Sequence, residues 1–135
     1  MATPASIGKH PIHPMLVAFP IGLWTFSLIT DILYIIGWGG PILNDLSYYT
    51  ILGGIIGAVL AAVPGFTDYL SLGGHPKNIA TWHLVVNVLA LGMFSISFAL
   101  RAVERPVLTA PFVLSLIGIG LIGLGGWLGG ELIYV

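Results

Sequence analysis

The chain alternates between four long apolar runs and short breaks rich in glycine, proline and polar residues. The runs cover residues 15–36, 46–63, 79–100 and 107–128. Each is close to the roughly 20 residues with which a helix crosses about 30 Å of hydrocarbon. Backbone polar groups in lipid must be bonded within the segment, which favours helices. The pattern predicts an all-α integral membrane four-helix bundle that forms a single domain over residues 1–135.

The breaks between the runs predict an up-down-up-down order. Gly39–Pro41 follows the first run, Pro64–Gly65 ends the second, and Arg105–Pro106 precedes the fourth. The first run is too long for the apolar region of a signal peptide and contains Asp31, so we expect it to span the membrane. Because the number of crossings is even, both termini should lie on the same side.

Composition narrows the class of protein further. Hydrophobic residues make up 57% of the chain and charged residues only 7%, against roughly a quarter charged in soluble domains. The lipid bilayer is therefore the expected surrounding. A net charge of -1 without a basic run gives no sign of nucleic-acid binding. The chain has no cysteine, which excludes disulfides, thiolate metal sites and covalently attached c-type haem.

Positive charges do not fix the orientation in the membrane. Lys9 and Lys77 fall on the side of the termini, whereas Arg101 and Arg105 fall on the opposite side. The two sides therefore tie by the positive-inside rule.

The predicted topology gathers most ionisable side chains on the side of the termini. They precede the first run, follow the second, open the third and close the fourth: His10, His13, Asp68, His75, His83 and Glu131. Ionisable groups at membrane depth are costly and usually mark a functional site. The alternative is that these are ordinary polar residues of interfacial loops.

The stretch KHPIHP, which precedes the first run, places two histidines before prolines. Proline disfavours the α region for the residue before it, so we expect His10 and His13 to be extended. Pro14 suits the first helical position. At the pitch of an extended polyproline turn, the two imidazoles would lie roughly 9 Å apart, too far to chelate one small ion. The prolines thus favour two imidazoles fixed separately, which suits a larger ligand.

His83 falls in the opening turns of the predicted third helix. Asn87 lies four residues later on the same face and is a candidate for orienting the imidazole ring. Beside Trp82, however, His83 is also typical of a residue in the aromatic belt at the membrane interface.

A weak internal repeat links the two halves. A shift of seventy residues pairs these positions: His13 with His83, Trp24 with Phe94, Ser27 with Ser97, Asp31 with Arg101, and Gly53 with Gly123. Parallel repeats of this kind are related by an axis along the membrane normal. The two histidines would then face each other across that axis.

Pairs of glycines four residues apart occur in the second and fourth predicted helices: Gly53 and Gly57, Gly125 and Gly129, and Gly126 and Gly130. Such pairs let helices approach closely. They equally leave room for a flat ring.

The segments HPIHPMLVAFPIG, PGFTDYL, TWHLVVN and GWLGGELIYV together resemble one known family. It is the group of small bacterial four-helix membrane proteins catalogued as domain of unknown function 2231. The resemblance implies a location in the bacterial cytoplasmic (inner) membrane. Some members are joined to, or encoded beside, Rieske-type iron–sulfur proteins, which implies electron transport and a partner of that kind.

The first hypothesis for function is a b-type haem protein that transfers electrons. His13 and His83 would be the axial ligands, with His10 as the alternative ligand and Asn87 orienting a ring. Four-helix bundles build cofactor sites from facing helices, and two imidazoles held on opposite sides of a ring suit haem.

Two further hypotheses stay open. One is a single transition-metal ion (zinc, copper or iron) held by His10, His13 and His83 with a carboxylate from Asp68 or Glu131. The other is a cofactor-free subunit of a larger redox complex or of a homo-oligomer. The sequence contains no hydrolase or transferase motif, so any activity should be that of a redox carrier.

Overall fold

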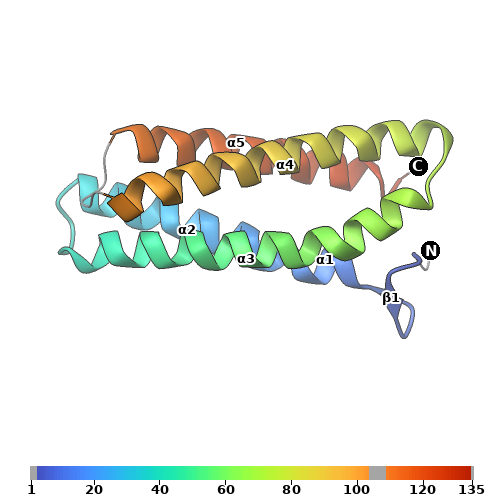
Figure 1. Cartoon of the computed structure of the whole chain (residues 1–135), viewed down its shortest axis with the longest axis horizontal. Coiled ribbons are helices and arrows are strands. Elements are labelled where there is room, and N and C mark those ends of the chain that lie inside the picture. The colour runs from blue at the N-terminus through green and yellow to red at the C-terminus, as the bar shows by residue number, and fades with distance from the viewer. Residues whose placement is uncertain (1–2, 104–108, 135) are drawn as a thin grey trace.

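The computed structural model describes residues 3–103 and 109–134. Four long helices form the bundle in Figure 1: α2 (Ala18–Ile35), α3 (Ile42–Leu70), α4 (Gly74–Val103) and α5 (Thr109–Glu131). They are preceded by a hairpin of two short strands, β1 (Ser6–Ile7) and β2 (His10–Pro11), and by the short helix α1 (Ile12–Leu16). The predicted all-α four-helix fold is confirmed.

All four helical segments are long and apolar enough to cross a membrane. For the first of them, α1 and α2 together make one candidate span, Ile12–Ile35. Residues 107 and 108, where the fourth span was predicted to begin, lie outside the described residues, as does the break at Arg105–Pro106.

The prediction that Pro64–Gly65 ends the second helix is wrong. α3 continues through Pro64 to Leu70. Proline removes one helical hydrogen bond, and membrane helices tolerate this because neighbouring groups replace the missing partner. α4 likewise begins at Gly74, earlier than the apolar run, so His83 lies in its third turn.

Consecutive long helices run in alternating directions, and both termini lie at the same end of the bundle (Figure 1). The densest contacts join α2 with α3 and α4 with α5. Further contacts between α3 and α4 and between α2 and α5 close the bundle. Helices α2 and α4 therefore face each other diagonally across the bundle axis.

Large side chains from the two diagonal helices fill the middle of the axis. Trp24 of α2 stacks on Phe94 of α4, with ring centroids 4.2 Å apart and planes 8° from parallel. The indole N–H of Trp24 donates to the carbonyl of Ile51 at 3.1 Å. Glycines on the other two helices make room, because a Cβ at Gly54 would collide with Trp24 and one at Gly118 with Phe94. The aromatic stack is thus accommodated by glycines on the two helices that flank it, and Ile51 of α3 completes the buried core.

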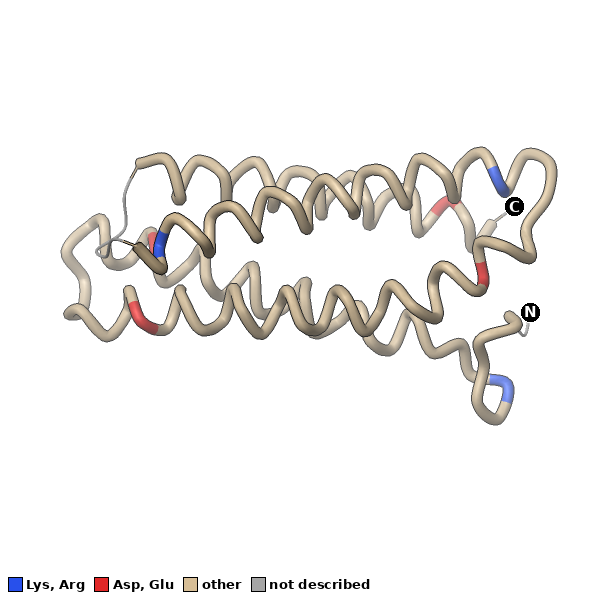
Figure 2. Tube along the Cα trace, in the orientation of Figure 1, with Lys and Arg blue, Asp and Glu red and all other residues tan. Residues whose placement is uncertain are grey.

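Among the described residues, the charged ones are concentrated toward the two ends of the bundle and none lies in its middle (Figure 2). At the end away from the termini, Asp31 and Arg101 form a buried ion pair, as the seventy-residue repeat indicated. Arg101 is therefore a buried, paired charge and no free loop charge, and Arg105 lies outside the described residues. The outer surface exposes many large apolar side chains, which suits contact with lipid.

Candidate functional site

The imidazole rings of His13 and His83 lie next to each other near the end of the bundle that holds the termini. Their ring centroids are 6.1 Å apart and their planes are 84° from parallel. His13 comes from α1 and His83 from α4, so the pair joins the two halves of the chain. The repeat predicted this meeting.

Each ring is fixed by a hydrogen bond to a helix backbone. Nδ1 of His13 lies 2.8 Å from the carbonyl oxygen of Ala61, and Nδ1 of His83 lies 2.9 Å from that of Gly125. A carbonyl oxygen only accepts, so both Nδ1 atoms carry the proton. In the neutral ring Nε2 then holds a free lone pair, and Nε2 of neither histidine is hydrogen-bonded to any described residue.

A glycine lies four residues after each accepting carbonyl. A Cβ at Gly65 would lie 2.6 Å from Nδ1 of His13, and one at Gly129 would lie 3.2 Å from Cε1 of His83. The missing side chains let each ring approach the backbone that holds it. The sequence marks this arrangement by a small residue followed four positions later by glycine: Ala61 and Gly65 in α3, and Gly125 and Gly129 in α5.

These contacts correct the predicted repeat in its second helices. Gly54 corresponds to Gly118, Ala61 to Gly125 and Gly65 to Gly129, a shift of 64 residues where the first helices show 70. The stretch between the paired positions is six residues shorter in the second half. The predicted match of Gly53 with Gly123 is therefore wrong.

Asn87 does not orient the ring of His83. Its side-chain nitrogen donates to the backbone carbonyl of His83 at 2.7 Å, within the same helix. Asparagine in a helix commonly bonds its own backbone in this way. The carbonyl of Gly125 takes the predicted role instead.

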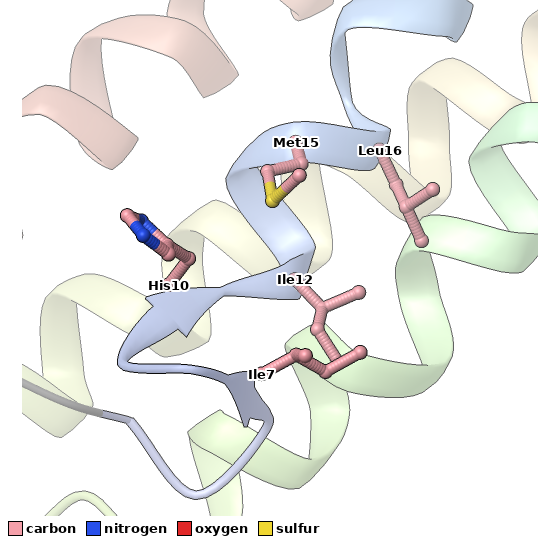
Figure 3. A pocket seen from close by; sticks show the side chains of 5 residues that line it. All are labelled: Ile7, His10, Ile12, Met15 and Leu16. Carbon is pink, nitrogen blue, oxygen red and sulfur yellow. The ribbon is translucent and has the colours of Figure 1, made fainter.

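The expected extended conformation of His13 is also wrong, because His13 is the second residue of α1. His10 does lie on a strand, and its side chain is exposed. Figure 3 shows it among the residues that line a surface pocket: Ile7, His10, Ile12, Met15 and Leu16. The ring contact and the hydrogen bonds that hold the pair involve His13 and His83 and not His10.

The remaining polar candidates do not complete a metal site. Among residues 3–103 and 109–134, no group of three or more His, Cys, Asp or Glu side chains could hold a metal ion. His75 and Glu131 are exposed. The five residues predicted as metal ligands are thus not assembled into one group.

Asp68 has a different contact from the predicted one. Its Oδ1 accepts the backbone N–H of Ala5 at 2.9 Å, and the carbonyl of Ala5 accepts the N–H of Ile12 at 3.0 Å. Between these points the hairpin turns at Gly8 and Lys9, both with positive φ. Asp68 therefore ties the segment that leads into His13 to α3.

Comparison with known proteins gives one match. The model of the family described as Predicted membrane protein (DUF2231) matches residues 9–135. No curated protein and no solved structure matches the chain. The match covers nearly the whole chain, including both paired histidines and all four long helices. The chain therefore belongs to the DUF2231 family of predicted membrane proteins.

Proposed function

We propose that this protein is a b-type haem-binding electron carrier of the bacterial inner membrane, with His13 and His83 as the two axial ligands. One observation carries the proposal: two imidazoles from opposite halves of the bundle meet, and each is held through Nδ1 by a backbone carbonyl. This leaves Nε2 of both rings for a ligand.

The spacing of the rings fits such a site. Two imidazoles that bind one metal from opposite sides, each through a bond of about 2 Å, have their ring centres about 6 Å apart. The observed separation of the centroids is 6.1 Å. Histidine ligands also commonly donate their other ring N–H to a backbone carbonyl, which fixes the tautomer and the ring orientation.

A bound haem would supply one-electron chemistry at its iron. The residues of the chain would hold it, fix the two rings and surround them with apolar helices, as bundle cofactor sites do. Both histidines are half-buried, and α1, which carries His13, lies near the end of the bundle where the termini lie (Figure 1). That position suits electron exchange with a partner at the membrane surface, and the family resemblance favours a Rieske-type iron–sulfur protein.

A second candidate is a cofactor-free subunit of a larger membrane complex. The observation that favours it is the edge-to-face geometry of the rings, because aromatic pairs pack with centroids about 4.5–7 Å apart without any ligand. A single transition-metal ion is also possible. The two imidazoles would give it only two ligands, so it would need further ligands besides the described side chains.

An absorption spectrum of the protein purified in mild detergent, together with metal analysis, tests the proposal. We expect a Soret band and, after reduction with dithionite, the sharp α band of a six-coordinate haem. His13→Ala and His83→Ala should each remove most of the bound haem. His75→Ala is the control, because its side chain is exposed and lies outside the pair, and His10→Ala tests the alternative ligand.

The other outcomes separate the candidates. Zinc or copper at one ion per chain, lost in the same two variants, would replace haem by a metal ion. If the purified protein contains neither pigment nor metal and other proteins purify with it, the result would favour the cofactor-free subunit of a larger complex. A Soret band that survives in both His13→Ala and His83→Ala would refute the assignment of the ligands.

A further inference from the structure

The proposed function leaves one buried polar cluster unexplained, at the end of the bundle away from the histidines. Nη1 and Nη2 of Arg101 donate to Oδ1 and Oδ2 of Asp31 at 2.8 Å and 2.6 Å. The side chains are only 1% and 0% exposed. Charges inside a membrane bundle are costly and are retained for a specific role.

The cluster is closed to ligands. Arg101 also donates from Nε to Ser97 at 3.2 Å, from Nη1 to Ser47 at 3.1 Å and from Nη2 to Ser115 at 3.4 Å. These bonds use all five N–H groups of the guanidinium. The partners come from all four long helices, so the cluster links the helices to one another and leaves no donor for an anion.

The cluster is in register with the histidine pair. Asp31 follows His13 by 18 residues, and Arg101 follows His83 by 18 residues. Eighteen residues make five helical turns, which rise about 27 Å and return to the same face. The count also holds in the first half, because Val17 between α1 and α2 keeps a right-handed helical conformation and helical hydrogen bonds. The stacked Trp24 and Phe94 lie between the two pairs on that same face.

The ion pair differs in kind from the other two pairs across the axis. Imidazole meets imidazole and aromatic meets aromatic, so either half could make those contacts with a copy of itself. A half paired with its own copy would place Asp31 against Asp31, or Arg101 against Arg101. Like charges buried together are strongly unfavourable, which excludes such pairings.

We propose that the Asp31–Arg101 ion pair makes the first half of the chain pair with the second half, and not with a copy of itself, and fixes the register between α2 and α4. The pair thereby positions His13 against His83 from the far end of the bundle. Asp31 and Arg101 are positioning residues, since neither touches the rings. Only the haem readout below depends on the proposed function.

The absence of native cysteine allows a direct test in the full-length chain. Met15→Cys and Trp82→Cys place spin labels close to the two histidines in sequence. The native side chains at these positions are 65% and 64% exposed. The distance distribution between the labels, measured by double electron–electron resonance in detergent, reports whether the two helices keep their register. It needs no bound cofactor.

Three charge variants are compared in this background. Asp31→Arg and Arg101→Asp should each broaden or shift the distance distribution and reduce the Soret band several-fold. The double exchange Asp31→Arg with Arg101→Asp should restore the narrow distribution and most of the band. Restoration is expected because Ser97, four residues before Arg101, accepts a hydrogen bond from it. Ser27 lies four residues before position 31 and could accept the same bond from an arginine there. Glu131→Arg, a charge reversal at an exposed position, is the control for net charge.

The results decide between clear alternatives. An unchanged distribution in both single variants, or a double exchange as disordered as the singles, would overturn the proposal. If the single variants do not accumulate in the membrane, accumulation of the double exchange supports it, and loss of all three overturns it. A wild-type protein without a Soret band would refute haem binding, while the label distances would still test the pairing.

Discussion

At the scale of single residues, two neighbouring glycines of α5 have opposite environments. A Cβ at Gly118 would lie 2.6 Å from Phe94, which is fully buried in the aromatic stack, whereas a Cβ at Gly120 would meet no atom within 4 Å. The first glycine is required by packing across the axis. The second only leaves helix backbone exposed.

We therefore expect Gly118→Ala to destabilise the bundle by about 1–3 kcal/mol, because it overpacks the core. Gly120→Ala should be neutral or stabilise it by up to about 1 kcal/mol, since alanine favours the helix. Thermal unfolding in one detergent, followed by circular dichroism, measures both. Equal effects of the two substitutions would contradict the assigned packing.

The histidine pair shows which residue-level features a sequence can reveal. The repeat pointed to His13 and His83 because imidazoles are rare enough to be noticed in an apolar chain. It did not reveal the partners of their Nδ1 atoms, because every residue carries a carbonyl and only the packing selects those of Ala61 and Gly125. Asn87 was assigned wrongly for the same reason, since its sequence spacing suits both the ring and its own backbone.

At the scale of elements, the N-terminal hairpin depends on a side chain of α3. Asp68 accepts the N–H of Ala5 and so holds the segment that begins α1. Asp68→Ala removes that acceptor, which costs about 1–3 kcal/mol locally for a bond to a charged group. Amide hydrogen exchange over residues 5–12 should become faster, while exchange in the middle of α4 should not change.

Two control variants sharpen this prediction. Asp68→Asn keeps an acceptor oxygen and should give slower exchange than Asp68→Ala. Thr67→Ala changes the exposed neighbouring residue and should leave the hairpin as it is. Exchange that does not differ between Asp68→Ala and the wild type would show that the hairpin is held by other contacts.

Hydropathy predicted the existence of the four long helices but not all their limits. Apolar runs mark the part of a helix that can lie in hydrocarbon, whereas α3 and α4 continue beyond their runs. Proline was taken as a stop at Pro64, but membrane helices tolerate the loss of one helical hydrogen bond, and α3 continues to Leu70. The separation of α1 from α2 at Val17 has no marker in the hydropathy of the chain.

At the scale of the whole molecule, the bundle predicts which positions share a side of the membrane. Both termini lie at one end, and the turn between α3 and α4 lies there too (Figure 1). His75→Cys and Tyr134→Cys, both at exposed positions, should therefore react together with a membrane-impermeant maleimide in sealed vesicles. Trp38→Cys, in the turn between α2 and α3, should react only from the opposite side.

Labelling of all three positions from one side would contradict the four crossings. The orientation that the labels give would also settle which compartment faces the histidine pair. Positive charges could not do this, because two of them lie on each side of the four crossings.

The diagonal arrangement of α2 and α4 has a consequence for how such a molecule can be built. Two separate identical subunits must present identical residues at a shared rotation axis. A single fused chain is free of that constraint, so it can keep matching imidazoles at one membrane surface and place opposite charges at the other. Joining the two halves in one chain thus allows a bundle that is nearly symmetric where its histidines meet and asymmetric at its other end, where an acid meets a base.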